Sequence, residues 1–244
     1  MKKAMKAVVT GHSKGLGEAI ARTLLERHIP VLGLARDVSP SLALAHPSLC
    51  TQTRIDLSNA ACLLEWLRTG LLHTFLSDCT TVLLINNAGT VQPVGALHQQ
   101  DPGEVAHAIA VNVSAPLMLA AALAQAAPRA QRRILHVSSG AARNAYPGWS
   151  VYCATKAALD HHARAVQLDG DSSVRICSLA PGIIDTGMQA ALRATPDVNF
   201  PLRQRFLDLH REGQLVAPAD CAERLIAYLL AHDFGSKPVD DLRG

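Results

Sequence analysis

The chain has few aromatic residues, no run of basic residues and no Cys-x-x-Cys pair among its 244 residues. Nucleic-acid-binding domains usually cluster basic residues and add aromatic side chains, so nucleic acid is not an expected partner despite a formal net charge of +3. The six cysteines are far apart, which argues against a disulfide framework and against a zinc site. They indicate reduced, mostly buried thiols, and a cytoplasmic location is expected.

Long apolar segments and two catalytic motifs are also missing. The apolar run that follows the basic N-terminal residues stops at Thr10, which is too early for a signal peptide. No other segment has about 18 uninterrupted apolar residues, so no membrane association is expected. There is no His-Glu-x-x-His, and adjacent His161 and His162 would point apart on a helix, so no metal site is predicted. The absence of Gly-x-Ser-x-Gly argues against a serine hydrolase.

Short apolar runs alternate with helical patterns along the chain, and 49% of its residues are hydrophobic. Strands are predicted at residues 7–10, 31–35, 53–55, 82–85, 134–137 and 174–179. Helices are predicted at residues 16–27, 60–76, 104–127, 151–168 and 219–231. This alternation predicts an α/β fold, a Rossmann-type doubly wound parallel sheet with helices on both faces, in a single domain over 1–244.

Two segments interrupt the alternation. Residues 37–49 are rich in proline, so any helix there should be short. Residues 186–215 mix polar and apolar residues irregularly. An insertion late in an open α/β sheet lies beyond the carboxyl ends of the strands, so this segment is predicted to cover a substrate.

A glycine-rich turn follows the first predicted strand and precedes the first predicted helix. Glycines allow a tight turn and a close approach of the backbone to a pyrophosphate, which binds at the positive end of the helix dipole. The turn therefore predicts a dinucleotide site. Its candidate cofactor-binding residues are Gly11, Ser13, Lys14, Gly15, Leu16 and Gly17.

The end of the second predicted strand bears on which dinucleotide binds. Arg36 could bind a 2′-phosphate, with Lys14 as a second positive charge, and this favours NADP(H). Asp37 leaves NAD open, because a carboxylate at that place can bind the ribose hydroxyls instead. In that case the alternative is an NAD-dependent secondary-alcohol dehydrogenase.

Ser139 follows a predicted strand, and Tyr152 and Lys156 lie one helical turn apart thirteen residues later. A lysine cation beside a tyrosine favours the phenolate, so Lys156 is expected to lower the pKa of Tyr152. A tyrosine tuned in this way could give a proton to a carbonyl oxygen while Ser139 holds that oxygen.

Asn112 is a fourth catalytic candidate. Pro116 lies four residues later in a predicted helix and has no N–H, so the carbonyl of Asn112 loses its helical partner and the helix should kink. The freed carbonyl could hold a water molecule.

Several ordered motifs together resemble the short-chain dehydrogenase/reductase family over essentially the whole chain. They are Thr10-Gly11-xxx-Gly15-x-Gly17, Asp56-Leu57, Asn86-Asn87-Ala88-Gly89, Asn112, Ser139, Tyr152-xxx-Lys156 and Pro181-Gly182-xxx-Thr186. The resemblance implies that Asp56 meets the adenine and that Lys156 reaches the nicotinamide ribose. It also implies a proton relay through a water molecule at Asn112, and a homodimer or homotetramer. It extends the cofactor-binding set to Asp56, Leu57, Asn87, Ala88, Gly89, Tyr152, Lys156, Pro181, Gly182, Ile184, Thr186 and Met188.

Within that family the chain is most similar to benzil reductases and sepiapterin reductases, which implies an NADPH-dependent reductase of vicinal dicarbonyl compounds. Trp149 and Met188, with Leu192 and Phe200, are candidates for an apolar wall of the substrate pocket. Asp240 is the candidate for a substrate-anchoring aspartate, although the tail around it has no clear apolar run for a final strand. A non-enzymatic dinucleotide sensor is the alternative from another class, because a fold does not fix a function.

Overall fold

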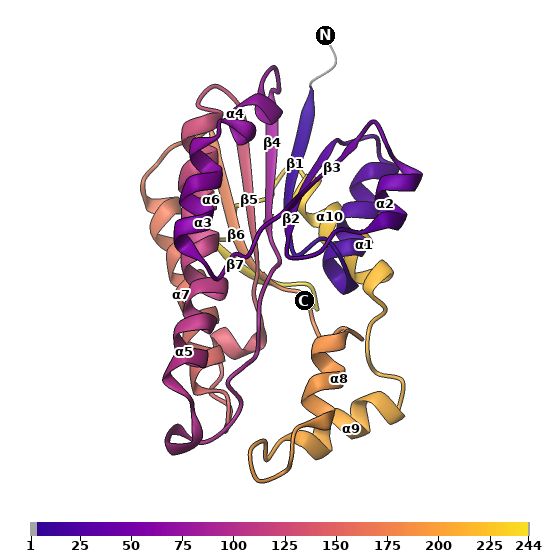
Figure 1. The fold of residues 1–244 in the computed structure, drawn as a ribbon, viewed down its shortest axis with the longest axis vertical. Coiled ribbons are helices and arrows are strands. Elements are labelled where there is room, and N and C mark those ends of the chain that lie inside the picture. The colour runs from indigo at the N-terminus through magenta and orange to yellow at the C-terminus, as the bar shows by residue number, and fades with distance from the viewer. Residues whose placement is uncertain (1–3, 244) are drawn as a thin grey trace.

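The computed structural model describes residues 4–243 and arranges them around a seven-stranded parallel sheet (Figure 1). The strands are β1 (Met5–Thr10), β2 (Val31–Ala35), β3 (Cys50–Arg54), β4 (Thr81–Asn86), β5 (Gln131–Val137), β6 (Val174–Ala180) and β7 (Val239–Asp241). Their order in the sheet is β3-β2-β1-β4-β5-β6-β7. The direction of winding reverses between β1 and β4, which is where open α/β sheets bind ligands at the carboxyl ends of the strands.

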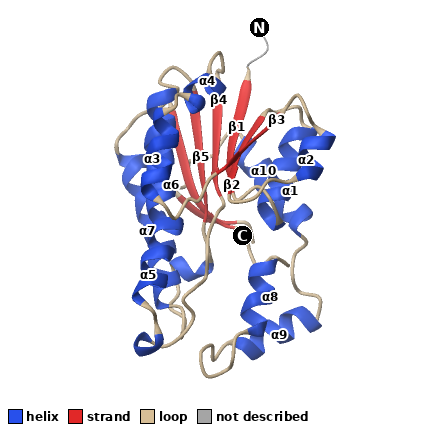
Figure 2. Cartoon of the chain, in the orientation of Figure 1, coloured by secondary structure: helices blue, strands red, loops and turns tan. Residues whose placement is uncertain are grey.

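Helices cover both faces of the sheet (Figure 2). One face carries α1 (Gly15–Glu26), α2 (Pro40–Ala45) and α10 (Pro218–Leu230), and the other carries α3 (Ala60–Arg68), α4 (Leu71–Leu76), α6 (Ala115–Ala126) and α7 (Ser150–Leu168). Consecutive residues of β1 serve separate cores, since Val9 packs with the α1 and α10 side and Val8 with the α3 and α6 side. The strands are therefore apolar throughout, and the predicted fold class is confirmed.

Two predicted helices differ from the structure. The helix expected at 60–76 divides into α3 and α4, because Gly70 has a φ of 77° that a right-handed helix cannot continue through. The helix expected at 104–127 consists of α5 (Pro102–Ile109), a π turn η2 (Ala110–Ser114) and α6. The π turn lies directly before Pro116, whose missing N–H was predicted to disturb the helix here.

The continuous helix Pro102–Ala126 is long and apolar enough, by length and composition, to cross a membrane, with a mean hydropathy of 1.7 in its most apolar window. Its apolar residues are interrupted by polar ones, so it has no uninterrupted apolar run of about 18 residues. Leu119 and Leu123 of this helix pack into the core against the sheet, yet 33% of the window is buried. Many of its other residues are half-buried, and Ile109 is its one large hydrophobic side chain among the exposed ones of the described chain.

The structure corrects two expectations, one about the C-terminal tail and one about the cysteines. Residues 186–215, where the sequence pattern is irregular, contain α8 (Gly187–Ala194) and α9 (Arg203–Arg211), which lie beyond the carboxyl ends of the strands (Figure 1). The tail does form a final strand, because β7 pairs through its backbone with β6 although two of its residues are aspartates. The six cysteines are free, but Cys177 and Cys221 alone are buried, so the expectation of mostly buried thiols is wrong.

Candidate active site

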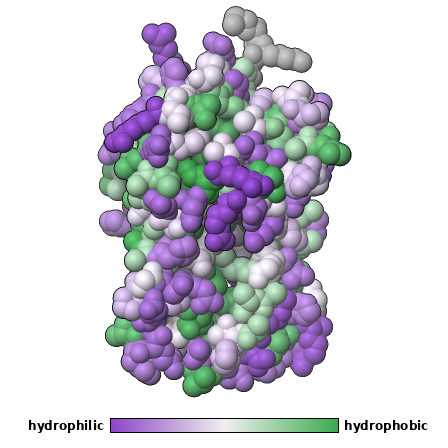
Figure 3. Space-filling view, viewed as in Figure 1, coloured by the Kyte–Doolittle hydropathy of each residue, from purple (hydrophilic) through white to green (hydrophobic). Residues whose placement is uncertain are grey.

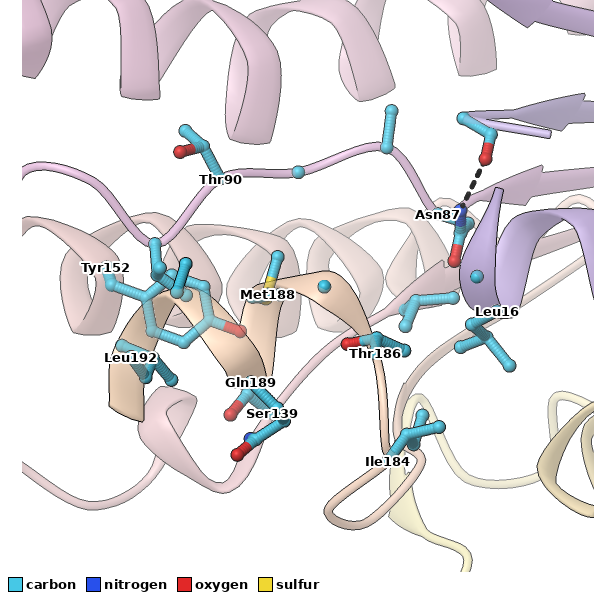
Figure 4. Close-up of a pocket in the computed structure, with 18 of the residues that line it drawn as sticks. Leu16, Asn87, Thr90, Ser139, Tyr152, Ile184, Thr186, Met188, Gln189 and Leu192 are labelled. Atoms are coloured by element: carbon cyan, nitrogen blue, oxygen red, sulfur yellow. Dashed lines mark hydrogen bonds between the residues drawn. The ribbon is translucent and has the colours of Figure 1, made fainter. Parts of the chain in front are cut away.

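A cavity of about 800 Å³ lies at the carboxyl ends of the central strands and continues beneath α8 and α9. Its volume is within the range of small-molecule and cofactor sites. Hydrophilic atoms gather around the middle of the molecular face in Figure 3, above the level of these two helices. Figure 4 shows Tyr152 and Leu192 at one end of the cavity and Leu16 and Asn87 at the other.

The structure brings nearly all of the predicted site residues together around this cavity. Its lining includes Gly11, Ser13, Lys14, Gly15, Leu16, Gly17, Arg36, Asp56, Leu57, Asn87, Ala88, Gly89, Ser139, Trp149, Tyr152, Lys156, Pro181, Gly182, Ile184, Thr186 and Met188. Asn112 and Asp240 do not line it. We call the part around the turn from Gly11 to Gly17 the glycine end, and the part around Trp149 and Tyr152 the aromatic end.

Backbone geometry builds the glycine end. Gly15 has a φ of 58°, and a Cβ at Gly17 would overlap the carbonyl oxygen of Gly11, so α1 can start this close to β1 only with glycine there. Asn87 fixes the turn, since its Nδ2 donates to the Thr10 carbonyl at 3.0 Å. The side chain of Lys14 does not cap α1, which leaves N–H groups of the first turn available to an anion. These residues fit a dinucleotide pyrophosphate.

His12, a buried histidine beneath this turn, was not predicted from the sequence. The ring of His12 is fully buried against Gly33 of β2, where a Cβ would overlap it. His12 Nε2 lies 2.7 Å from Gln52 Oε1, which also accepts a hydrogen bond from the Ser39 N–H at 2.7 Å. Burial lowers the pKa of His12. The available signal was Gly33 itself, because glycine inside an apolar strand often marks a close approach.

The charged groups of the glycine end differ in how they are held. Lys14, Arg36 and Asp37 are exposed, and within residues 4–243 no ion pair joins any of them to an opposite charge. Asp56, by contrast, accepts hydrogen bonds from the Ser58 hydroxyl at 2.7 Å and the Ser58 N–H at 2.9 Å. These bonds lower the pKa of Asp56 and keep its carboxylate ionised and oriented.

Ser139, Tyr152 and Lys156 meet where β5 ends and α7 begins. Ser139 caps the short helix η3 (Gly140–Ala142), where its hydroxyl accepts from the Ala141 N–H at 3.2 Å, and it lies near enough to Tyr152 to affect the pKa of that phenol. Lys156 Nζ lies 5.6 Å from the centre of the Tyr152 ring and donates to the carbonyl of Val137 at 2.8 Å. Tyr152 and Lys156 are both buried.

The predicted lowering of the Tyr152 pKa by Lys156 is wrong. Burial raises the pKa of Tyr152 to about 12, and the nearby Ser139 hydroxyl offsets only part of that effect. Burial also lowers the pKa of Lys156 to about 8, against the opposing effect of Asp160. Burial disfavours the charged form of both groups, so Tyr152 holds its proton at neutral pH.

Asn112 lies in the π turn and is buried beside the active residues. Its Oδ1 accepts from the Thr90 N–H at 2.8 Å, and its Nδ2 donates to the Thr90 carbonyl at 2.8 Å and to Thr155 at 3.1 Å. A Cβ on Gly89 would lie 3.2 Å from Asn112 Oδ1 and 3.7 Å from Lys156 Nζ. The side chain of Asn112 thus fixes the strand-end loop next to Lys156, and its role in a proton relay stays a prediction.

Trp149 is the centre of the aromatic end. Its ring stacks on Phe200 with centroids 5.0 Å apart and contacts Tyr152 edge-on at 5.3 Å. Phe200 is fully buried behind Trp149 and does not line the cavity, so its predicted place in the pocket wall is wrong. Phe206 and Tyr146 do line it, but both were missed because tertiary packing, not spacing, brings them there.

Asp240 faces away from the cavity. Its Oδ2 accepts a hydrogen bond from Tyr228 of α10 at 3.0 Å, on the opposite side of β7 from the substrate region. Alternation along the strand instead sends Asp241 toward Arg243, which lines the cavity. The structure therefore contradicts Asp240 as a substrate ligand.

The family model described as short chain dehydrogenase matches residues 5–197. The chain belongs to the short-chain dehydrogenase family. A benzil reductase ((S)-benzoin forming) of Bacillus subtilis (strain 168) is 35% identical over 228 residues, covering 91% of this chain and 92% of the relative. A sepiapterin reductase of Meriones unguiculatus is 33% identical over 244 residues, covering 94% and 92%.

The same family includes a solved structure similar over the whole length. A short-chain dehydrogenase/reductase from Burkholderia vietnamiensis is 47% identical, covers 100% of this chain and 99% of its own, and gives a TM-score of 0.73. As a short-chain dehydrogenase, the chain is an oxidoreductase enzyme that uses a nicotinamide dinucleotide. The resemblance predicted from its motifs, including the similarity to benzil and sepiapterin reductases, is confirmed.

Proposed function

We propose that this short-chain dehydrogenase is an NADPH-dependent carbonyl reductase of vicinal dicarbonyl compounds, with Tyr152 as the proton donor. The observation that carries the proposal is the position of Tyr152. Its buried, protonated hydroxyl lies near Ser139 at the aromatic end of a cavity that continues to the glycine end.

The chemistry needs one hydride and one proton. The nicotinamide, when bound, supplies a hydride to the carbonyl carbon. Ser139 and Tyr152 hold the carbonyl oxygen, and Tyr152 gives it the proton as negative charge develops there, so that a ketone becomes an alcohol. The Lys156 cation stabilises the phenolate that remains, and solvent protons then restore Tyr152. A high pKa for Tyr152 suits this reductive direction, because the group starts protonated.

Preference for NADPH is supported by the charges at the rim of the glycine end. Arg36 and Lys14 line the cavity there and are free of carboxylate partners within the described part of the chain. A 2′-phosphate would supply the anion that two such cations bind. Asp37 lines the same rim and is the residue that would favour NAD.

A flat, apolar substrate is supported by the aromatic end. Trp149, Tyr146 and Phe206 line it together with Met188 and Leu192 of α8. The helices α8 and α9 lie over this end, as proposed for a substrate-covering segment at 186–215. Benzil carries two aromatic rings on adjacent carbonyls, and the relatives named for benzil and sepiapterin support the same class.

The experiment is a loss of NADPH absorbance on adding benzil, with sepiapterin in parallel. Wild-type protein should turn over at least one of them, and Tyr152→Phe should lower kcat by about 10²- to 10⁴-fold, the usual contribution of a proton donor. Because Tyr152→Phe keeps the ring, its contact with Trp149 is retained. Equal turnover by the variant and the wild type would refute Tyr152 as the donor.

Location, partners and oligomeric state also belong to the proposed function. We infer a cytoplasmic protein that binds neither nucleic acid nor a membrane, and that forms a homodimer or homotetramer. The exposed Ile109 and the half-buried apolar residues of the helix Pro102–Ala126 support self-association. Light scattering coupled to gel filtration tests this: a mass near 26 kDa at micromolar concentration would contradict an oligomer of 25.9 kDa chains.

A further inference from the structure

Asp160 is a buried carboxylate that the chemistry above does not use. It lies on α7 one helical turn after Lys156 and is 1% exposed. Its Oδ1 accepts hydrogen bonds from the Ser138 hydroxyl at 2.8 Å and the Ser178 hydroxyl at 2.7 Å. Its Oδ2 has no hydrogen-bond partner within residues 4–243 and lies 3.6 Å from Arg143 Nε. Burying a carboxylate costs free energy unless nearby charges and hydrogen bonds compensate it. Here the two serine hydroxyls and Arg143 are the compensating groups.

Lys156 and Asp160 fasten α7 to consecutive residues at the end of β5. Lys156 donates to the carbonyl of Val137, and Asp160 accepts from the hydroxyl of Ser138. The next residue is Ser139, which lines the cavity with Tyr152. Two successive residues of this strand end are therefore held by two residues of one helix face, and a change at Asp160 reaches both Lys156 and the turn that carries Ser139.

We propose that Asp160 is a positioning residue that keeps Lys156 charged and holds the Ser138–Ser139 turn against α7. This inference rests on the proposed function for its catalytic consequence, but the electrostatic coupling of Asp160 to Lys156 stands apart from it. A carboxylate one turn away on the same helix face stabilises a buried ammonium, which would otherwise lose its proton more readily.

The other groups around this pair leave Lys156 as the one that changes charge near neutral pH. Burial lowers the pKa of His136 to about 3 and lowers that of its α7 neighbour His162 below the ordinary value. Burial raises the pKa of Cys177 to about 11 and that of Tyr152 to about 12. Arg143 stays cationic on the open side of Asp160. Between about pH 6 and 10 a titration of this cluster therefore reports on Lys156.

The test is a ¹³C NMR titration of protein labelled at lysine Cε, without dinucleotide. The chain has six lysines, Lys2, Lys3, Lys6, Lys14, Lys156 and Lys237, so the signal of Lys156 is assigned by its loss in Lys156→Arg. Wild-type Lys156 should titrate near pH 8. Asp160→Asn keeps the shape and an acceptor for both serines, and should move the midpoint down by about one pH unit.

Asp169→Asn is the matched control, because Asp169 ends the same helix but is exposed. In this variant the titration midpoint of Lys156 should equal that of the wild type. Arg143→Gln is a second variant at a partly exposed site; removing this competing cation should move the midpoint up. If Asp160→Asn does not fold, an unchanged midpoint in Arg143→Gln overturns the proposal. An unchanged midpoint in folded Asp160→Asn overturns it directly.

The pH profile of kcat distinguishes the coupling of Asp160 to Lys156 from the proposed catalytic role of Lys156. If Lys156 must be charged, the alkaline limb of the kcat profile should move to lower pH in Asp160→Asn by the same shift that NMR measures, while Asp169→Asn keeps the wild-type profile. A shifted NMR midpoint with an unshifted profile would keep the coupling and remove Lys156 from catalysis. A structural defect alone would lower kcat at every pH without moving the limb.

Discussion

The two ends of the cavity are built in different ways. At the glycine end the backbone forms the turn itself, since the φ of Gly15 and the close approach of Gly17 to Gly11 both require glycine, and N–H groups of the first turn of α1 have no side-chain cap. At the aromatic end side chains are the surface, and Trp149 is held by stacking on the buried Phe200. The glycine end therefore tolerates almost no substitution of its glycines. The aromatic end is a packed cluster of side chains whose shape can vary while it stays apolar. A dinucleotide common to a family suits the first kind of site, and a variable substrate suits the second.

The largest expected effect is at the aromatic end. Trp149→Ala removes a ring in contact with four other rings, and loss of a buried tryptophan costs about 3–5 kcal/mol of unfolding free energy. KM for benzil should rise, whereas Kd for NADPH should not change. Urea unfolding and fluorescence titration with NADPH measure the two effects. A weaker Kd for NADPH in folded Trp149→Ala would show that the two ends are not independent.

Gly17→Ala tests the glycine end. The added methyl group would overlap the Gly11 carbonyl oxygen, so the turn has to move away from α1, at a cost of about 1–3 kcal/mol. If that cost falls on the bound state, Kd for NADPH rises by about 5- to 150-fold. The same titration measures it, with unfolding free energy as the control. An unchanged Kd would mean that the turn does not touch the dinucleotide.

This contrast also explains what could be predicted from the sequence. Residues that lie within one turn or one helical step of each other could be predicted, because their spacing along the chain fixes their relative positions. These are Gly11, Gly15 and Gly17, and Tyr152 and Lys156. Phe206 and Tyr146 reach the cavity only through tertiary packing, and their spacing carries none.

The wrong expectations have equally physical causes. The pKa of Tyr152 follows burial, which no sequence pattern measures. Phe200 is apolar, as a pocket wall requires, but it is fully buried behind Trp149 and does not reach the cavity. Asp240 fails by the register of a strand, in which a shift of one residue sends a side chain to the opposite face.

A smaller effect is expected at the rim of the glycine end. Arg36→Ala removes one exposed cation, and a hydrogen bond to a charged group contributes about 1.5–3 kcal/mol, with the lower value fitting an exposed side chain. KM for NADPH should rise about tenfold. KM for NADH should stay the same and serves as the internal control, because NADH has no 2′-phosphate. An unchanged KM for NADPH would remove the NADP assignment and favour Asp37 at the ribose.

The smallest effect is expected on β7, where two neighbouring residues face opposite sides. Asp240→Ala loses the hydrogen bond from Tyr228, at a cost of about 1 kcal/mol in unfolding free energy, and should leave kcat and KM for sepiapterin unchanged. Arg243→Ala is the matched variant, because Arg243 lines the cavity and should change KM instead. A raised KM in Asp240→Ala alone would place its carboxylate at the substrate and would require β7 to shift by one residue. The aromatic end would then carry a fixed polar anchor like those of the glycine end, and the contrast between the two ends would be smaller than the structure shows.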